Sequence, residues 1–295
     1  MKYIITGSLG NISLPVIKNL VNDGHDVTVI SSSADKKSEI EALDAHAAIG
    51  SVEDVPFLKD TFKNADIAYL MIPSSFAIEN YELFQLQVAD HYIEALTGSS
   101  IKYVVLLSSI GAHLRQGAGP IDALGYLEEK LLSLPGIQSN FLRPSYFFNN
   151  LFSQAGLIEH AGIAGSNFGD SDEKLVLTDT DDIAAVATEA LLNRPAENKI
   201  TYIASDERHP SEIATILGKA VGKENIPWIP FTDEQALEGM RGAGLNESFA
   251  GLYVEMGQAL RNGTMQEDYW KNRPVLGNYK LEDFAKKFAA VYENA

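Results

Sequence analysis

Short apolar segments alternate with segments of helix length through the first half of this chain, and the alternation constrains its fold more than any other feature. The expected strands are residues 3–6, 27–30, 47–49, 67–72, 103–108 and 138–143, and the expected helices are 14–23, 54–63, 81–96 and 124–134. Strand–helix alternation of this kind predicts an α/β fold, a doubly wound parallel sheet with helices on both faces. The strands are apolar without strict alternation, which is typical of strands buried on both sides.

The second half of the chain changes character, because helices predominate and glycines and prolines interrupt them. We expect a strand at 199–204 and helices at 181–192, 210–221, 232–243, 247–262 and 282–294. No repeat, low-complexity stretch or flexible linker separates the halves. We therefore predict a doubly wound domain at residues 1–150, to which residues 182–205 return, and a smaller C-terminal α/β lobe at residues 151–295.

Composition excludes several classes of function. The chain of 295 residues holds 23 Lys and Arg against 40 Asp and Glu, a net charge of −17, and no cysteine. Without cysteine there is no disulfide or thiol catalysis, and the histidines show no metal-ligand spacing, so we expect no metal. The acidic excess argues against direct nucleic-acid binding. No apolar run reaches the roughly 18 residues of a membrane helix, and the N-terminus is not a signal peptide. We expect a cytoplasmic monomer or homodimer.

A glycine-rich motif follows the first expected strand and opens the first helix. It reads Thr6-Gly7-Ser8-Leu9-Gly10-Asn11-Ile12-Ser13. Gly7 allows a tight turn, and Gly10 lets the backbone approach a pyrophosphate, which then lies at the helix N-terminus. Ser13 stands where such motifs usually end in a third glycine, and its small side chain still permits close packing. Between a strand and a helix, the motif predicts a dinucleotide-binding site.

The residues after the second strand favour NADP(H) over NAD(H). An NAD site usually places Asp or Glu there to accept the ribose 2′-hydroxyl. This chain instead reads Ser31-Ser32-Ser33-Ala34-Asp35-Lys36-Lys37. The hydroxyls and lysines can receive a 2′-phosphate. The alternative is a solvated serine loop followed by lysines on the next helix, and the arginine that is usual in NADP sites is missing.

Several blocks together resemble the NmrA-like family of atypical short-chain dehydrogenases/reductases, and they occur in the family's order. The blocks are residues 6–13, 50–54, 108–113, 119–121, 142–150, 181–184 and 281–285. They span nearly the whole chain, although the family more often has Asp where this chain has Ser51. The resemblance implies an NADP-binding Rossmann core and a smaller C-terminal lobe that closes over the nicotinamide end.

The resemblance also implies the residues that contact the cofactor. They are Gly7, Ser8, Leu9, Gly10, Asn11 and Ile12 for the phosphates, Ser31, Ser32 and Lys36 for the 2′-phosphate, Ser51 and Val52 for the adenine, and Ile72, Pro73 and Ser108 for the nicotinamide ribose. Pro144, Tyr146 and Phe147 would flank the nicotinamide ring and the substrate. The aromatic residues from Tyr146 onward have an alternative interpretation as ordinary packing between lobes.

Four further residues are candidates for chemistry or structure. Tyr126 and Lys130 have the Tyr-x-x-x-Lys spacing of a proton relay and share one helix face. Their helix ends soon after Lys130, whereas the tyrosine helix of the catalytic enzymes continues for several turns, so an exposed amphipathic turn is the alternative. His113 follows the carboxyl end of a strand, where ligands bind in open α/β sheets, and is either a substrate-pocket residue or a surface histidine. Arg143, after an apolar strand, is predicted to form a structural ion pair.

The leading functional hypothesis is an NADPH-dependent oxidoreductase that transfers a hydride to a small quinone-like or unsaturated carbonyl acceptor. Such a transfer can proceed without a strong general acid, because the cofactor carries the chemistry. The alternative is a non-catalytic regulator that senses the redox state of NAD(P) and binds a protein partner. A nucleotide-sugar epimerase is a third option, which needs a working Tyr/Lys pair. With a net charge of −17, an anionic cofactor must be held by local donors in residues 10–12 and 31–37.

Overall fold

A parallel sheet forms the centre of the protein. The computed structural model describes residues 1–75, 77–169 and 174–293. The strands of the sheet are β1 (Lys2–Ile5), β2 (Asp26–Ser31), β3 (His46–Ile49), β4 (Ile67–Leu70), β5 (Tyr103–Leu107), β6 (Gln138–Pro144) and β10 (Lys199–Ile203). Their order in space is β10-β6-β5-β4-β1-β2-β3. The doubly wound α/β fold is therefore confirmed, and the strand order reverses between β1 and β4, where ligands bind in such sheets.

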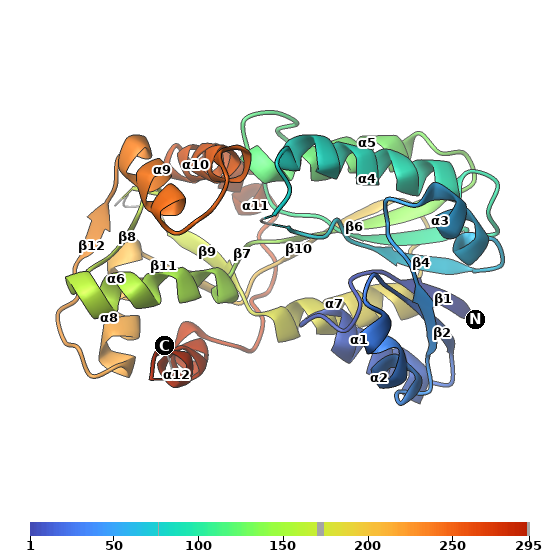
Figure 1. Cartoon of the computed structure of the whole chain (residues 1–295), viewed down its shortest axis with the longest axis horizontal. Helices are drawn as coiled ribbons and strands as arrows, with labels where there is room; N and C mark the ends of the chain where they lie inside the picture. The colour runs from blue at the N-terminus through green and yellow to red at the C-terminus, as the bar shows by residue number, and fades with distance from the viewer. Residues whose placement is uncertain (76, 170–173, 294–295) are drawn as a thin grey trace.

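Helices cover both faces of this sheet (Figure 1). One face carries α1 (Ser13–Asn22), α2 (Lys37–Glu41) and α7 (Thr180–Leu192), and the other carries α3 (Val55–Phe62), α4 (Tyr81–Leu96) and α5 (Asp122–Leu132). Each face buries its own apolar cluster, with Val16 and Ala187 in the first and Leu58, Val88 and Leu127 in the second. The continuous apolar runs of the strands follow from this burial on both sides.

Polar side chains fix where several of these helices begin. Asp54 caps α3 by accepting a hydrogen bond from the Phe57 N–H at 3.0 Å. Asn80 caps α4 through the Leu83 N–H at 3.0 Å. Asp179 caps α7 through the N–H of Asp181. Each cap satisfies a backbone donor that has no partner inside the helix.

The remaining elements form a smaller body beside the central sheet. Its strands are β7 (Tyr146–Phe147), β9 (Leu175–Thr178) and β11 (Asp206–Arg208) in one sheet, and β8 (Ala164–Ser166) with β12 (Trp228–Pro230) in another. Its helices are α6 (Gln154–Ala161), α8 (Pro210–Ala220), α9 (Asp233–Gly242), α10 (Glu247–Arg261), α11 (Glu267–Lys271) and α12 (Leu281–Tyr292), with the 3-10 turns η3 (Phe148–Ser153) and η4 (Thr264–Gln266). The last residue of the expected C-terminal helix, Asn294, lies outside the described residues.

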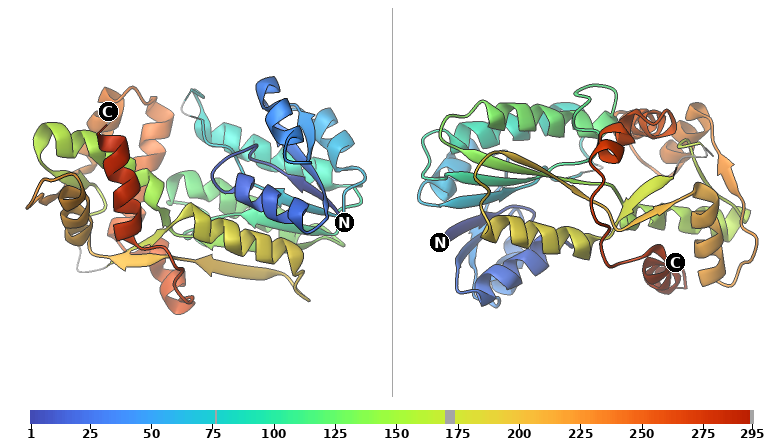
Figure 2. Two further views of the ribbon diagram at one scale, coloured as in Figure 1. Left: turned by 90° about the horizontal axis from the view of Figure 1, so that it is seen from below. Right: turned by 180° about the vertical axis from the view of Figure 1, so that it is seen from behind.

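The chain crosses between the two bodies more than once. From β9 it enters α7, which packs against α1, and β10 then pairs with β6 in the large sheet (Figure 2). The domain boundary at residue 150, with residues 182–205 returning to the first domain, stays a prediction.

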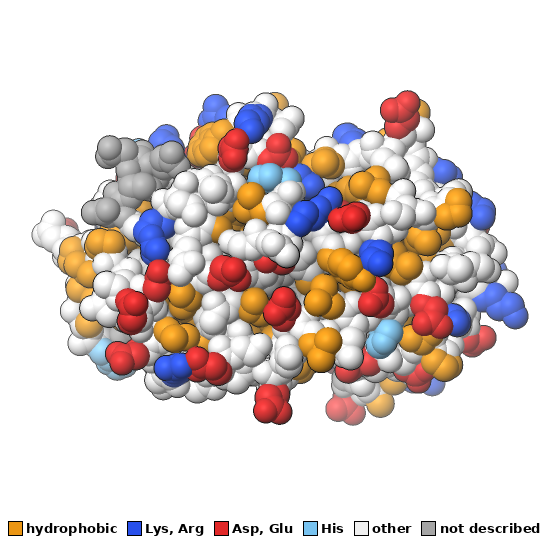
Figure 3. All heavy atoms as spheres, turned by 90° about the horizontal axis from the view of Figure 1, so that it is seen from above, with side chains coloured by type: hydrophobic (Ala, Val, Ile, Leu, Met, Phe, Trp, Pro, Cys, Tyr) orange, Lys and Arg blue, Asp and Glu red, His pale blue; other side chains and the backbone are white. Residues whose placement is uncertain are grey.

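Surface charge, helix length and the placement of possible metal ligands were predicted from the sequence and can be compared with the structure. On the face formed by α4, α5 and α10, acidic and basic side chains are interspersed (Figure 3). Among the described helices, none is long and apolar enough to cross a membrane. Within the described residues, the histidines and acidic side chains form no group of three or more that could hold a metal ion.

Candidate functional site

The turn between β1 and α1 has a geometry that requires glycine. Gly7 adopts φ of 88°, in the left-handed region, and a Cβ added there would lie 2.7 Å from the Ser13 Oγ. The Gly10 N–H donates to the Gly7 carbonyl at 3.1 Å. The Ser13 hydroxyl donates to the Thr6 carbonyl at 3.0 Å and is buried. The serine that replaces the third glycine therefore closes the turn by a hydrogen bond.

The rest of the loop divides into an exposed tip and a buried base. Leu9 packs against the apolar cluster under α1 and α7, and Ile12 is buried at the start of the helix. Asn11 lies exposed between them. The first turn of α1 contains no acidic residue, and no side chain caps the helix. The Leu14 N–H donates to the Gly10 carbonyl at 2.9 Å, and Pro15 has no N–H. Within the described residues, the N–H groups of residues 11–13 are the ones at this end that form no hydrogen bond and can face an anion.

Ser8 joins the loop to the carboxyl end of β2. Its N–H donates to the Ile30 carbonyl at 3.2 Å, and its hydroxyl donates to the Ser31 Oγ at 2.9 Å. Ser31 is buried, and Ser32 is exposed. The Lys36 ammonium lies 3.0 Å from the Glu39 carboxylate in a partly exposed pair. The structure thus brings the loop and Ser31 into direct contact, while Lys36 shares its charge with Glu39.

The two residues expected near the adenine follow β3. The Gly50 N–H donates to the Ser31 carbonyl at 3.0 Å, which holds this segment against the end of β2. Ser51 Oγ accepts a hydrogen bond from the Glu53 N–H at 3.1 Å, and the Val52 carbonyl lies 3.3 Å from His91 Nδ1. Ser51 and Val52 therefore lie next to the loop that contains Ser31.

The ends of β4 and β6 hold the residues expected at the nicotinamide side. The Met71 N–H donates to the Thr6 hydroxyl at 2.8 Å, so the segment leading to Ile72 and Pro73 is held beside the end of β1. Ile72 is buried, and Pro73 is partly exposed. Pro144 is buried at the end of β6, and its carbonyl accepts a hydrogen bond from the Ile110 N–H at 3.0 Å.

Ser108 belongs to a buried hydrogen-bond network with Glu128 and Arg143. Its hydroxyl donates to Glu128 Oε1 at 2.5 Å. Arg143 donates to both oxygens of the same carboxylate, from Nε at 3.0 Å and from Nη2 at 2.6 Å. The side chains of Arg143 and Glu128 are only 3% and 1% exposed. The predicted ion pair of Arg143 is confirmed, and its partner is a residue that the sequence analysis did not single out.

The network continues from Arg143 into the smaller body. Arg143 Nη1 donates to the Tyr202 hydroxyl at 3.0 Å and to Asp268 Oδ2 at 3.1 Å, and the Tyr202 hydroxyl also donates to Asp268. Burial opposes the charge of Arg143, but the hydrogen bonds and charge of Glu128 outweigh it and raise the arginine pKa. Burial and the hydrogen bond to Asp268 raise the pKa of Tyr202 to about 12. A single chain of polar contacts therefore links the end of β5 to α11.

Tyr126 and Lys130 lie apart from this network. The Tyr126 hydroxyl donates to Asp90 Oδ1 of α4 at 2.8 Å, and the Lys130 ammonium lies 4.9 Å from the centre of the Tyr126 ring. Glu128, on the same helix, is the residue that reaches Ser108. The signal for Glu128 was present in the sequence, since it occupies a position on the apolar stripe of α5 between Leu127 and Leu131.

His113 lies beside the end of the network near α11. Both of its ring nitrogens are buried without a hydrogen-bond partner among the described residues. Burial lowers the pKa of His113, and the nearby charge of Asp268 partly opposes this effect. The structure therefore places between the β5 loop and the smaller body an imidazole whose burial disfavours its protonated form.

Aromatic side chains gather where β7 enters the smaller body. The Tyr146 ring meets the Phe168 ring edge-on at 5.2 Å, and Phe249 stacks on Tyr253 of α10 at 4.4 Å. Burial raises the pKa of Tyr146, and the neighbouring Tyr253 phenol adds to the effect. Phe147 packs instead against the cluster under α1 and α7. Tyr146 and Phe147 thus face different surroundings, and Tyr253 was not among the expected site residues.

A model of the NAD(P)H-binding family matches residues 7–194 of the chain. The chain therefore belongs to this NAD(P)H-binding family, as the resemblance drawn from its sequence blocks implies. No curated protein sequence matches it significantly.

Solved structures share the fold over nearly the whole chain. The NADPH-dependent quinone oxidoreductase of Escherichia coli, in complex with NADPH, has a TM-score of 0.81 at 17% identity, over 97% of this chain and 99% of that chain. Triphenylmethane reductase of Citrobacter sp. has a TM-score of 0.79 at 17% identity, over 98% and 100%. A nucleoside-diphosphate-sugar epimerase from Staphylococcus aureus has a TM-score of 0.80 at 17% identity, over 97% and 100%. At these identities the similarity establishes the fold alone.

Proposed function

We propose that this protein is an NADP(H)-dependent oxidoreductase whose acceptor is a small, flat molecule such as a quinone or an unsaturated carbonyl compound. The observation that carries the proposal is the contact between Ser8 in the glycine loop and Ser31 at the end of β2. It places a hydroxyl where an NAD-specific site would place a carboxylate. Two similar structures, a quinone oxidoreductase and a triphenylmethane reductase, are described with NADPH and NADP(H), which adds support.

The residues of the loop fit the phosphates of such a cofactor. The uncapped start of α1 offers N–H donors, and Gly10 keeps the approach to them clear of a side chain. Ser31, Ser32 and Lys36 supply donors for a 2′-phosphate, and the exposed Lys36–Glu39 pair can be exchanged for a phosphate at small energetic cost. Bound NADPH would supply the hydride.

The other end of the site suits an acceptor that needs little proton donation. Ser108 is oriented by Glu128, and Pro144 and the aromatic ring of Tyr146 offer apolar surface for a flat molecule. Within the described residues, Tyr126 donates to Asp90 of α4, Lys130 lies over the Tyr126 ring, and neither side chain forms a hydrogen bond with Ser108. A quinone or enone accepts a hydride without a strong general acid, so this arrangement is consistent with the proposed acceptor class.

Two measurements test the proposal. The first is NADPH oxidation against a panel of quinones and enones, for which saturable turnover is expected with at least one acceptor. The second compares Kd for NADPH and NADH. Ser31→Asp should shift the preference toward NADH by about tenfold or more, since it removes one phosphate contact and adds a repelling charge. Ser211→Asp, at an exposed position at the start of α8 and outside the expected cofactor contacts, is the matched control. Tight NADPH binding without turnover of any acceptor would refute the enzymatic role.

A regulator that senses the redox state of the cofactor is the second candidate. The observation that favours it is the hydrogen bond of Tyr126 to Asp90, which engages the phenol with α4 while Ser108 is bonded to Glu128. A sensor must bind its protein partner with different affinity in the presence of NADP⁺ and NADPH. Equal affinity in both states would exclude this role.

A further inference from the structure

Helix α10 carries aromatic side chains from the smaller body to the carboxyl edge of the central sheet (Figure 1). Its start is bonded to the segment that follows β4, because the Ser248 hydroxyl accepts a hydrogen bond from the Tyr81 N–H at 3.2 Å and the Asn246 amide donates to the Ile78 carbonyl at 2.7 Å. The helix also packs on the 3-10 turn η2 (Gly119–Ile121), which follows β5. It therefore lies against the segments that follow β4 and β5, the strands whose ends are expected to hold the nicotinamide side of the cofactor.

Aromatic rings from both bodies gather at this helix, and we call them the aromatic set. The Phe249 ring stacks on Tyr253 at 4.4 Å and tilts against Tyr81 at 5.1 Å, and the Tyr146 ring meets Phe168 edge-on at 5.2 Å. Burial, and after it the neighbouring Tyr253 phenol, raises the pKa of both Tyr81 and Tyr146. The two groups of rings therefore adjoin at Tyr253. Such a set offers a broad apolar surface to a flat molecule.

The hydroxyls of Tyr146 and Tyr253 differ from those of other tyrosines in the core. Tyr92 and Tyr103 each donate to a backbone carbonyl, at 2.8 Å and 2.9 Å. By contrast, no described residue forms a hydrogen bond with the hydroxyl of Tyr146 or of Tyr253, and neither oxygen is fully buried. Two O–H donors without a protein partner are therefore accessible beside the rings.

The surroundings of these two phenols keep them protonated. Burial raises the pKa of Tyr146 and of Tyr253, so both remain O–H donors at neutral pH. A hydrogen bond to a charged oxygen is stronger than one to a neutral oxygen. Neutral donors held in apolar surroundings therefore stabilise negative charge that develops on a bound molecule.

Tyr146 lies close to the residues expected at the nicotinamide. It follows Pro144 by two residues at the carboxyl end of β6, and the Ser108 N–H donates to the Leu142 carbonyl of the same strand at 2.8 Å. The phenol donors and the expected source of the hydride thus share one edge of the sheet.

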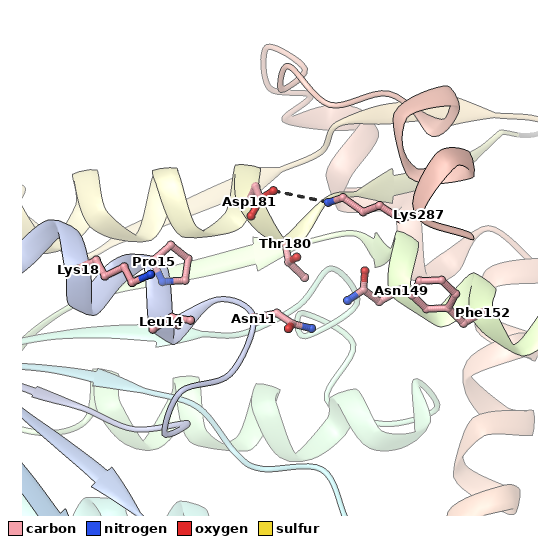
Figure 4. A pocket seen from close by; sticks show the side chains of 9 residues that line it. All are labelled: Asn11, Leu14, Pro15, Lys18, Asn149, Phe152, Thr180, Asp181 and Lys287. Carbon is pink, nitrogen blue, oxygen red and sulfur yellow. Dashed lines mark ion pairs between the residues drawn. The ribbon is translucent and has the colours of Figure 1, made fainter. Parts of the chain in front are cut away.

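A groove beside the starts of α1 and α7 is a different opening near the glycine loop (Figure 4). Its volume is about 520 Å³, and Phe152 is the aromatic side chain in its described lining. The Lys287 ammonium lies 3.6 Å from both Asp179 and Asp181, so its charge is compensated. No tyrosine belongs to the described lining. The aromatic set therefore suits a flat, uncharged carbonyl compound better than this groove does.

From this arrangement we propose that Tyr253 and Tyr146 bind the carbonyl oxygen of the acceptor and stabilise the charge that it gains during hydride transfer. The proposal rests on the oxidoreductase function proposed above. The acceptor receives the hydride with its two electrons, its oxygen becomes an anion, and NADPH becomes NADP⁺. That oxygen then takes a proton from water, while both phenols keep their own protons.

Steady-state oxidation of NADPH by 1,4-naphthoquinone tests the proposal on the full chain. We expect Tyr253→Phe to lower kcat and kcat/KM together by about a hundredfold, since the lost hydrogen bond strengthens only as charge develops. Tyr146→Phe should act in the same direction, and the double variant should lose less than the product of both effects, because the two donors share one oxygen.

The folded state and the cofactor site should not change in these variants. Tm and the Kd for NADPH are expected to stay the same, because neither hydroxyl has a protein partner to lose. Tyr292→Phe is the matched control, since its ring packs on the same apolar cluster of the smaller body and its hydroxyl forms no hydrogen bond with a described residue. It should keep full activity.

Binding of 4-nitrophenolate, followed by its absorbance in the presence of NADP⁺, tests the phenol pair without turnover. Its anionic oxygen resembles that of the reduced acceptor, so we expect saturable binding that each Tyr→Phe change weakens about tenfold. Neutral 4-nitroanisole should bind more weakly than the phenolate.

The two assays separate failure of this proposal from failure of the oxidoreductase function. Phenolate binding that depends on Tyr253, without turnover of any acceptor, would refute the enzymatic role and support the phenol pair as an oxyanion site. Turnover that Tyr253→Phe leaves unchanged would overturn the proposal and leave the oxidoreductase function standing. Equal binding of phenolate by the unaltered protein and both variants, or no binding at all, would also overturn it.

Discussion

The bidentate pair of Glu128 and Arg143 should dominate the local stability of the site. Glu128→Gln keeps the shape of the side chain but leaves the arginine charge buried, and removing one partner of a buried pair costs about 3–5 kcal/mol. We expect the lower end, about 3 kcal/mol, because Arg143 retains its contact with Asp268. Arg143→Met should lie near the upper end, about 5 kcal/mol, because Glu128 is only 1% exposed and loses both arginine hydrogen bonds.

The double variant distinguishes a coupled pair from two independent losses. Glu128→Gln with Arg143→Met leaves no charge at the centre of the network, and Asp268, at 28% exposed, can be hydrated. We therefore expect the double variant to lose less than the sum of the two, with a coupling free energy of about 3 kcal/mol.

Denaturant unfolding measures these free energies. It is followed by circular dichroism and by tryptophan fluorescence, and the two unfolding curves must coincide for a two-state free energy to be valid. The exposed pair of Lys59 and Glu94, at 2.7 Å, serves as a control, because Glu94→Gln should leave the transition midpoint unchanged. Additivity of the two buried substitutions within about 0.5 kcal/mol would refute the reasoning, since uncoupled residues behave in that way.

Three further perturbations have defined outcomes. Gly7→Ala should abolish NADPH binding in a fluorescence titration, because the added Cβ meets Ser13 at 2.7 Å and φ of 88° is strained for alanine; retained affinity would contradict the loop assignment. Tyr126→Phe should leave turnover nearly unchanged, since its hydroxyl binds Asp90, and a collapse in kcat would restore the proton relay. Hydrogen bonds from Arg261, first among its partners, lower the pKa of Asp233 to about 2. This pair's stabilisation is therefore present above the unfolded pKa of about 3.9 and is lost as the pH falls through 2. Asp233→Asn should cost about 1 kcal/mol at pH 7, discounted for partial exposure, and should flatten the acid limb of the stability profile.

The central sheet could be predicted from the sequence because its strands are apolar runs separated by complete helices. The helix at residues 81–96 was expected with the same ends that the structure gives it, and the other expected helices differ by one or two residues at their ends. The short helices α2, α6 and α11 were not predicted. The strands β7, β8, β9, β11 and β12 were not predicted. They are two to four residues long, too short to show a period, and they depend on partners distant in sequence.

In the site, too, features set by neighbouring residues could be predicted from the sequence, and features set by packing between distant segments could not. The glycine loop is a local feature, because Gly7 and Ser13 act within one turn, and spacing alone indicated it. The Tyr126–Lys130 spacing also placed both side chains on one helix face, as expected. Which face of α5 meets the sheet depends on the burial of Leu127 and Leu131, and that packing turns Glu128 toward Ser108.

The polar chain from Ser108 to Asp268 limits how this protein can be recombined with its relatives. Arg143 belongs to the large sheet, Tyr202 returns to that sheet after a long excursion, and Asp268 comes from the smaller body. A chimaera joined at residue 150 would inherit the arginine from one parent and both of its distal partners from the other. A chimaera made from two related proteins should therefore take all three of these residues from the same parent, even though the large sheet and the smaller body are separate in shape.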